Sequence, residues 1–270
     1  MHELLNRLTA KERRGSRLRC LLLTEGTKEE VAIRLNEIVT TWATVDPNRH
    51  VWQTQGWSDV NEAKLGETAP FLSPANQKAV TDWWLASKGR GQANTPNWDI
   101  ISQATVRGQE GLILIEAKAH SAELKAEGKA LKKDASAGSR RNHTRITAAI
   151  DEANTAFNDI TFGFQGLKHD FNLSINTHYQ LANRFAWAYK VASLGVPVVL
   201  VYLAFSAATE MEDQGTPFDT ATDWIKCLVD HAEGIVPDTA WHATLKVNGT
   251  PIYAIIRSIR QDIPPKLRQH

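Results

Sequence analysis

Pro96-Asn97-Trp98-Asp99-Ile100-Ile101 and Leu112-Ile113-Leu114-Ile115-Glu116-Ala117-Lys118-Ala119-His120 are the two stretches that decide the fold. In the second stretch, four apolar residues run directly into Glu116 and Lys118. Strand side chains alternate between two faces, so Glu116 and Lys118 share one face about 7 Å apart. A strand this apolar belongs inside a sheet, where a charged side chain needs a partner. The pattern predicts a buried strand that ends in a polar site.

A hairpin brings a second acid to that site. Two strand-like runs, 98–106 and 111–120, flank Gly108-Gln109-Glu110, which is typical of a compact hairpin connection. Counting outward from residues 108 and 109 places Asp99 opposite residue 118 of the second strand. We therefore expect Asp99, Glu116 and Lys118 to converge at one end of the sheet.

The segments around the hairpin show both helical and strand patterns. Thr27-Lys28-Glu29-Glu30 has the spacing of a capping box and predicts a helix over 28–43, and Ser73-Pro74 predicts the start of a helix over 74–87. The apolar run 198–205 is typical of a strand covered on both faces. The other predicted elements are helices over 3–14, 146–157, 177–193 and 217–229, a strand over 17–23, and a hairpin of 241–247 with 252–259 around Asn248-Gly249. This order predicts an α/β fold with a mixed central sheet flanked by helices.

Composition narrows the class of protein further. The 270 residues, 42% of them hydrophobic, are enough for one domain with a buried core. No apolar run reaches the roughly 18 residues of a membrane span, so we expect no membrane association. Two cysteines cannot form a disulfide framework, which favours a cytoplasmic protein. With 31 basic and 30 acidic residues the net charge is +1, so nucleic-acid binding has to rest on local clusters.

Two carboxylates that converge inside a sheet repel each other unless a cation lies between them. Oxygen ligands of this kind select a hard divalent ion, Mg²⁺ or in its place Mn²⁺. Such an ion polarises a phosphoryl oxygen and acidifies a bound water. Lys118 can orient or deprotonate that water, or neutralise charge as it develops. Asp99, Glu116 and Lys118 together predict metal-assisted hydrolysis of a phosphodiester.

The same residues resemble the PD-(D/E)XK nuclease superfamily, also called restriction-endonuclease-like. Asp99 is followed by an interval of 16 residues and then by Glu116-Ala117-Lys118 at the end of an apolar strand. The family core is a helix, a hairpin that carries these groups, and a helical crossover into another strand, so the resemblance covers about 74–205. It implies a restriction-endonuclease-like core over 73–205. Residues 1–72 would be an N-terminal α/β extension packed on that core, and 206–270 a C-terminal helix and hairpin completing the same domain.

The resemblance also implies a role for each residue of the motif. Asp99 and Glu116 would be metal ligands, the Ala117 carbonyl would be a further ligand, and Lys118 would be the catalytic lysine. Most members are Mg²⁺-dependent DNA nucleases, and some act on RNA or are inactive. The expected activity is therefore cleavage of phosphodiester bonds, with DNA favoured over RNA.

Other acids and a histidine are candidates for auxiliary roles. Many members carry an additional acid on the helix before the hairpin, for which Asp82, Glu67 and Glu62 are the candidates here. His120 continues the face of Glu116 and Lys118, although a histidine at a strand end is more often part of the polar surface.

The predicted crossover helix and the start of the hairpin add three more candidates. Gln180 is followed four residues later by Arg184, where an exonuclease-like branch has tyrosine, so that branch is not supported. Gln180 and Arg184 share a helix face and can reach the site or a phosphate. Trp98, beside Asp99, is a candidate for stacking on a base.

Residues 121–145 form a basic run. Seven lysines and arginines minus three acids leave a local charge of +4. Such a run can neutralise phosphates as a flap over DNA, or it can be a solvated charged loop. The candidate nucleic-acid-binding residues are Lys125, Lys129, Lys132, Lys133, Arg140 and Arg141.

Three alternatives to an active nuclease stay open at the level of sequence. The chain can be a catalytically inactive nuclease-like domain that binds nucleic acid or a protein partner. It can be an unrelated α/β protein in which Glu116 and Lys118 have no catalytic role. In that case the two residues can simply form a salt bridge on the same face of an edge strand. It can also be another metal-dependent phosphate ester hydrolase that acts on nucleotides. Whether the chain forms a homo-oligomer is also open.

Overall fold

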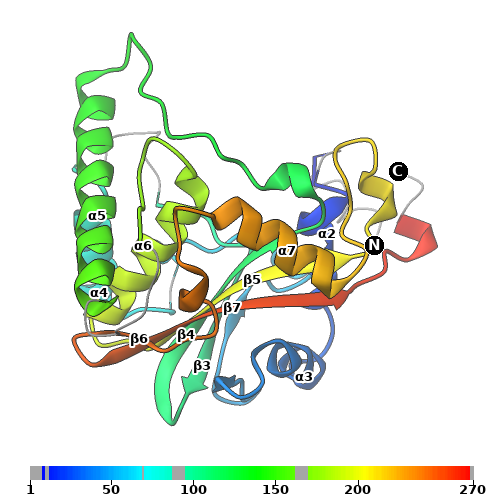
Figure 1. Ribbon diagram of the computed structural model, residues 1–270. Coiled ribbons are helices and arrows are strands. Elements are labelled where there is room, and N and C mark those ends of the chain that lie inside the picture. Colours follow the sequence, from blue (N-terminus) through cyan, green and yellow to red (C-terminus); the bar gives the residue numbers. More distant parts are fainter. Residues whose placement is uncertain (1–7, 10–11, 69, 87–94, 162–169, 268–270) are drawn as a thin grey trace.

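A mixed seven-stranded sheet lies at the centre of the protein, which confirms the predicted α/β class. The computed structural model describes residues 8–9, 12–68, 70–86, 95–161 and 170–267 (Figure 1). The strand order is β1-β3-β4-β5-β7-β6, and β2 also pairs with β3. Pairing is antiparallel at the β1–β3, β2–β3, β3–β4 and β6–β7 contacts and parallel at β4–β5 and β5–β7. The strands are β1 (Ala43–Thr44), β2 (Trp52–Gln53), β3 (Ile100–Val106), β4 (Gln109–Lys118), β5 (Val198–Ser206), β6 (Leu245–Val247) and β7 (Thr250–Arg260).

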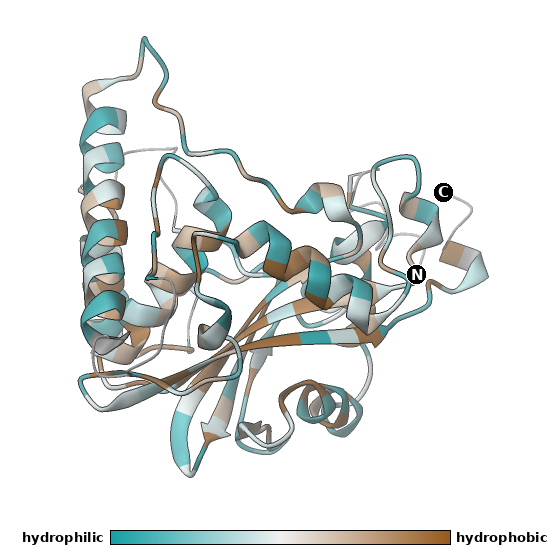
Figure 2. Ribbon diagram, in the orientation of Figure 1, coloured by the Kyte–Doolittle hydropathy of each residue, from teal (hydrophilic) through white to brown (hydrophobic). Residues whose placement is uncertain are grey.

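Helices cover both faces of the sheet. One face packs against α4 (Pro74–Trp84), α5 (Ala137–Thr161), α6 (Tyr179–Ser193) and α7 (Ala221–Ala232). The other face packs against α2 (Gly15–Leu23) and α3 (Lys28–Val39). Short 3₁₀ turns complete the structure: η1 (Ser121–Glu123), η2 (Thr209–Met211), η3 (Asp238–Ala240) and η4 (Pro265–Leu267). Figure 2 shows that the central strands are mostly hydrophobic, whereas α5 carries many hydrophilic residues.

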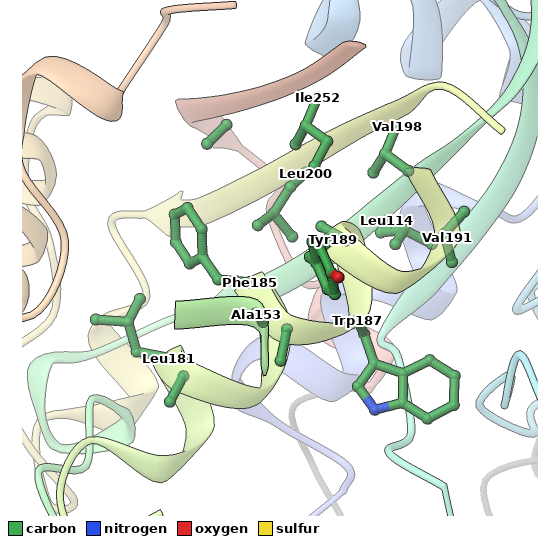
Figure 3. Packing of buried hydrophobic residues seen from close by; sticks show 14 of the residues in the cluster. Leu114, Ala153, Leu181, Phe185, Trp187, Tyr189, Val191, Val198, Leu200 and Ile252 are labelled. Carbon is green, nitrogen blue, oxygen red and sulfur yellow. The ribbon is translucent and has the colours of Figure 1, made fainter. Parts of the chain in front are cut away.

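Alternation along β4 determines which side chains reach which face. Leu112 and Leu114 belong to the core under α4–α7, whereas Ile113, Ile115 and Ala117 belong to the core under α2 and α3. In Figure 3, Leu114 packs with residues of β5 and β7 against α6. The same alternation carries Glu116 and Lys118 onto the face covered by α6. This is the shared face that the sequence predicts.

The turn of the β3–β4 hairpin differs from the predicted one. It consists of Arg107 and Gly108 with φ of +48° and +86°, and Val106 pairs with Gln109. Positive φ at both central residues is the geometry of a two-residue type I′ hairpin turn, which glycine adopts readily. The prediction that Asp99 lies opposite residue 118 is therefore wrong by two residues. Since the shift is even, every side chain keeps its face, and Asp99 falls beside Glu116.

Several predicted element boundaries also change. The predicted strand over 17–23 is wrong, because these residues form α2; a short apolar run has no periodicity that separates a buried helix from a buried strand. The basic run is partly helical, since α5 begins at Ala137. The predicted helix over 3–14 falls largely outside the described residues. Within the described part of the chain, no helix combines the length and the apolar character needed to cross a membrane.

Leu114→Ala tests the packing of the central strand. Leu114 is fully buried in the core between β4 and α6, so truncation leaves a cavity and should lower the free energy of unfolding by about 2–5 kcal/mol. Urea denaturation measures this change. Leu131→Ala is the control, because Leu131 is 40% exposed and its truncation should change stability by less than about 0.5 kcal/mol. Equal effects of the two substitutions would contradict the assigned core.

Candidate active site

A cavity of about 670 Å³ lies at the carboxyl end of β4, between α6 and the segment that follows β4. This end of parallel strands is where α/β sheets commonly bind ligands. The residues predicted from the hairpin motif lie together in its wall. The lining residues are Ser16, Glu62, Pro96, Asn97, Asp99, Glu116, Ala117, Lys118, Glu123, Lys125, Glu127, Gly128, Lys129, Tyr179, Gln180, Asn183 and Arg184.

Glu116 is held by three donors. It is only 1% exposed, and its Oε1 accepts hydrogen bonds from Lys118 Nζ and from Gln180 Nε2, the latter at 2.6 Å. Its Oε2 accepts from Arg184 Nε at 2.6 Å. Burial alone would raise the pKa of the carboxyl, but the charges of Arg184 and Lys118 outweigh it and lower that pKa. The interpretation of Glu116 and Lys118 as a salt bridge on an edge strand is wrong in its position, because β4 lies between β3 and β5 inside the sheet.

Asp99 occupies the place where the hairpin ladder ends. The last paired residues are Ile100 and Ile115, and the amide of Trp98 donates instead to the Ala63 carbonyl at 2.9 Å. The Ala117 amide then donates to Asp99 Oδ2 at 2.8 Å. Because the N–H and C=O of one strand residue point to the same side, the Ala117 carbonyl also faces this edge.

The protonation of Asp99 responds to its surroundings. Asp99 is half-buried, and within the described residues it forms no ion pair. Burial and the nearby charge of Glu116 raise the pKa of Asp99 from 3.8 to about 7. A cation close to both carboxylates would reverse this shift, since an opposite charge favours the ionised form.

Lys118 is an ammonium group in this arrangement. Burial alone would lower its pKa, but Glu116 and Asp99 outweigh burial and raise that pKa. A protonated lysine can donate a hydrogen bond to a water or neutralise charge, but it cannot take a proton from a water.

The auxiliary candidates separate into two groups. Gln180 and Arg184 reach the site, where both donate to Glu116. Asp82 does not, since it forms an ion pair with Lys78 on the exposed side of α4. Of the other two acids, Glu67 pairs with Lys64 at 3.6 Å, whereas Glu62 lines the cavity. The expectation that α4 supplies the additional acid is therefore wrong for Asp82.

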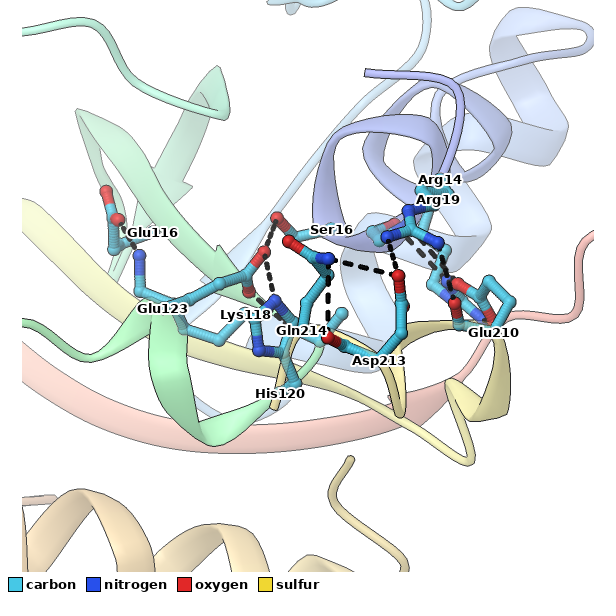
Figure 4. Close-up of polar contacts among 12 residues, drawn as sticks. Arg14, Ser16, Arg19, Glu116, Lys118, His120, Glu123, Glu210, Asp213 and Gln214 are labelled. Carbon is cyan, nitrogen blue, oxygen red and sulfur yellow. Dashed lines mark hydrogen bonds and ion pairs between the residues drawn. The ribbon is translucent and has the colours of Figure 1, made fainter. Parts of the chain in front are cut away.

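Glu123 connects the end of β4 to the start of α2, as Figure 4 shows. Its Oε2 accepts from the Ala119 amide at 2.6 Å, and its Oε1 accepts from Ser16 Oγ at 3.0 Å. His120 is buried next to it, with Nε2 3.7 Å from Glu123 Oε1, but does not line the cavity. Sequence reasoning missed Ser16, which no local motif connects to residues more than a hundred positions away.

The six basic candidates occupy two places. Lys125 and Lys129 line the cavity, whereas the other four are exposed on the segment before α5 and on its first turns. Figure 1 shows this segment running from η1 up to the top of α5. It is attached to the approach to α6, where Lys129 N donates to Ile175 O and His178 N donates to Ala126 O, each at 2.8 Å. A Cβ on Gly128 would lie 2.2 Å from Asn176 O, so only glycine permits this contact.

Trp98 cannot serve as a base-stacking platform in this conformation. It is fully buried, and the guanidinium of Arg184 lies 4.4 Å from the centre of its ring. The ring supports Arg184 instead.

The donor set is compatible with a hard divalent ion. Among the described residues, no cluster of three or more histidine, cysteine or acidic side chains is arranged to hold a metal. Mg²⁺, however, is commonly bound by one or two carboxylates, water and substrate phosphate rather than by a complete protein cage. Asp99, Glu116 and the Ala117 carbonyl supply that smaller set.

We compared the chain with family models, curated proteins and solved structures, and none of the three comparisons gives a match.

Asp99→Asn tests the perturbed carboxyl. Between pH 4 and the folded-state pKa of about 7, the folded chain keeps a proton that the unfolded chain has released. Stability contributed by Asp99 therefore falls as pH rises through this window. A pKa raised from 3.8 to about 7 corresponds to at most about 4 kcal/mol at pH 8, and the partial exposure of Asp99 to solvent reduces this energy. In metal-free buffer at pH 8, the Asn variant should therefore be more stable than the wild type by about 1–2 kcal/mol, and the gain should shrink towards pH 5.

Urea denaturation at several pH values, with EDTA present, measures this difference. Asp82→Asn is the matched control, because Asp82 is exposed and lies outside the cavity. Parallel pH profiles for the wild type and the Asp99 variant would show that the Asp99 carboxyl is not perturbed.

Proposed function

We propose that this protein is a metal-dependent nuclease that hydrolyses phosphodiester bonds in DNA. The observation that carries the proposal is the convergence of Asp99, Glu116, Lys118 and the Ala117 main chain in one cavity at the end of β4. These groups match, in type and in order along the chain, the acid and (D/E)-x-K of the PD-(D/E)XK nucleases.

The arrangement of elements supports a restriction-endonuclease-like core. Helix α4 precedes the β3–β4 hairpin, and two helices then lead into β5, which pairs parallel to β4. The N-terminal strands β1 and β2 and the C-terminal strands β6 and β7 extend the same sheet on either side. In this proposal they are additions to the core over 73–205.

Each residue of the motif would have one task. Asp99, Glu116 and the Ala117 carbonyl would hold Mg²⁺, or Mn²⁺ in its place. When bound, such an ion polarises a phosphoryl oxygen and lowers the pKa of a coordinated water. The Lys118 ammonium orients the attacking water and neutralises charge that develops on the phosphate oxygens. The Ala117 amide holds Asp99 in place through its hydrogen bond.

A catalytically inactive nuclease-like domain is the second candidate. The observation that favours it is that Glu116 has both oxygens engaged by Lys118, Gln180 and Arg184. A carboxylate neutralised in this way can be purely structural. Such a domain would bind nucleic acid or a protein partner without cleaving it.

Cleavage of linear DNA in the presence of Mg²⁺ tests the proposal. Wild-type protein should cleave, EDTA should abolish cleavage, and Lys118→Met should lower the rate by about 10²–10⁴-fold because the charged group near the reacting atoms is removed. Asp82→Asn should retain the wild-type rate, since Asp82 lies on the exposed face of α4.

Two other results would change the assignment. Wild-type protein that binds DNA but does not cleave it with Mg²⁺ or Mn²⁺ would favour the inactive domain. Hydrolysis of nucleotides or simple phosphate esters without cleavage of DNA or RNA would favour a different phosphate ester hydrolase.

Substitution of the exposed basic residues tests the nucleic-acid surface. Replacing Lys132, Lys133, Arg140 and Arg141 together by glutamine should weaken DNA binding. It should also reduce the slope of log K against log salt by up to about 0.9 for each phosphate that the variant no longer neutralises. Fluorescence anisotropy at several salt concentrations measures this slope. Lys78→Gln with Lys226→Gln is the control, because both lysines are exposed on other helices. An unchanged slope would indicate a solvated loop without a role in DNA binding.

A further inference from the structure

Arg184 is the most fully engaged of the charged groups that line the cavity. Its Nε donates to Glu116 Oε2 at 2.6 Å, its Nη1 to Asn183 Oδ1 at 3.0 Å and its Nη2 to the Asn97 carbonyl at 2.7 Å. The guanidinium also lies 4.4 Å from the centre of the Trp98 ring. Arg184 therefore holds together α6, the end of β4 and the loop before β3.

Charge balance sets a condition on metal binding. In their ionised forms, Asp99 and Glu116 carry two negative charges, and Lys118 and Arg184 carry two positive charges, so the four groups sum to zero. A divalent cation that entered alone would give these four groups a net charge of +2, or leave +1 when all nine charged residues of the lining are counted, which is costly where the site is buried. A phosphodiester that entered with the ion would remove one of these charges.

Arg184 is also well suited to receive that phosphodiester. Guanidinium groups bind phosphate oxygens through paired hydrogen bonds, and Arg184 already borders the cavity. A phosphate bound there competes with Glu116 for the same donors. Once Arg184 turns to the phosphate, Oε2 of Glu116 is released.

We propose that Arg184 is a positioning residue that couples metal binding to substrate binding. In the free protein the guanidinium of Arg184 is hydrogen-bonded to Glu116. A phosphodiester of the substrate strand draws the guanidinium away, so that Glu116 becomes available to the metal only when substrate is present. This inference rests on the proposed nuclease function. It adds an order of binding, in which the metal binds tightly only when the substrate is bound.

Wild-type protein provides the first test. Mn²⁺ binding is measured by isothermal titration calorimetry at pH 8, with and without a saturating phosphorothioate tetrathymidylate, which keeps the negative charge and resists hydrolysis. Mn²⁺ should bind about tenfold more tightly with the oligonucleotide, and Mn²⁺ should tighten oligonucleotide binding by the same factor. Equal Mn²⁺ affinity in both conditions overturns the proposal.

Arg184→Met separates this coupling from the direct contribution of substrate oxygens to the metal. The variant should bind Mn²⁺ alone about tenfold more tightly than the wild type, and the oligonucleotide should add less than about threefold. Lys190→Met is the control, because it removes one positive charge from the same helix, where Lys190 pairs with Glu152 outside the cavity. Full coupling retained in Arg184→Met, or the same gain in Lys190→Met, overturns the proposal.

Trp98 gives a readout that needs no variant of Arg184. The contribution of Trp98 to the emission spectrum is the difference between the wild type and Trp98→Phe. The oligonucleotide alone should change that contribution, because the guanidinium leaves the ring. If Arg184→Met does not fold, this signal and the wild-type calorimetry decide: no change in Trp98 emission overturns the proposal.

These outcomes differ from a failure of the nuclease assignment. If Mn²⁺ does not bind in any condition, with or without oligonucleotide, the proposed metal-dependent function fails and the coupling fails with it. If Mn²⁺ binds equally in all conditions and the wild type cleaves DNA, only the coupling fails.

Discussion

In the free protein, the ion pair of Glu116 with Arg184 at the end of a buried strand is the constraint on which the site depends. A carboxylate that is 1% exposed is stable only when its oxygens are satisfied, and removing one partner of such a pair leaves an uncompensated charge. The partner comes from α6, so this helix has to be seated on the sheet in one register. The Trp98 ring and the Asn97 carbonyl hold the other side of the guanidinium. Fold and site are therefore specified by the same contacts.

The β3–β4 turn transmits that constraint to Asp99. Arg107 and Gly108 are the two central residues of the turn, so the pairing of β3 with β4 ends at Ile100, on the side away from the turn. The Ala117 amide lies beyond this pairing and donates to the Asp99 side chain instead. A turn one residue longer would move Asp99 to the other face of the sheet, away from Glu116. The predicted register was wrong by two residues, and Asp99 nevertheless lies on the face of Glu116. Strand side chains alternate between two faces, so whether the two acids meet depends on whether a shift is odd or even.

Sequence reasoning found the parts of the site that local periodicity encodes. The shared face of Glu116 and Lys118, the hairpin, and the helical face of Gln180 and Arg184 all follow from residues a few positions apart. Two of the three donors to Glu116, Gln180 and Arg184, are 64 and 68 residues away in the chain, and Ser16 is 107 residues from Glu123. No local pattern encodes those distances. The same limit explains the wrong strand over 17–23, because α2 is helical through its packing against the sheet.

The charges around the cavity bear on whether the site suits metal-dependent hydrolysis or only the binding of a polyanion. Its lining contains five acids and four bases, a sum of −1, while four further basic residues lie outside it towards α5. A site built only to bind a polyanion would have more bases than acids in its wall. In the proposed function, the acids of the lining would lie beside the scissile phosphate, and the exposed bases towards α5 would lie along the rest of the strand. That distribution is unfavourable for a phosphate alone and favourable for a phosphate together with a cation. In the proposed function, a metal ion would supply the positive charge that makes this cavity complementary to a nucleic acid.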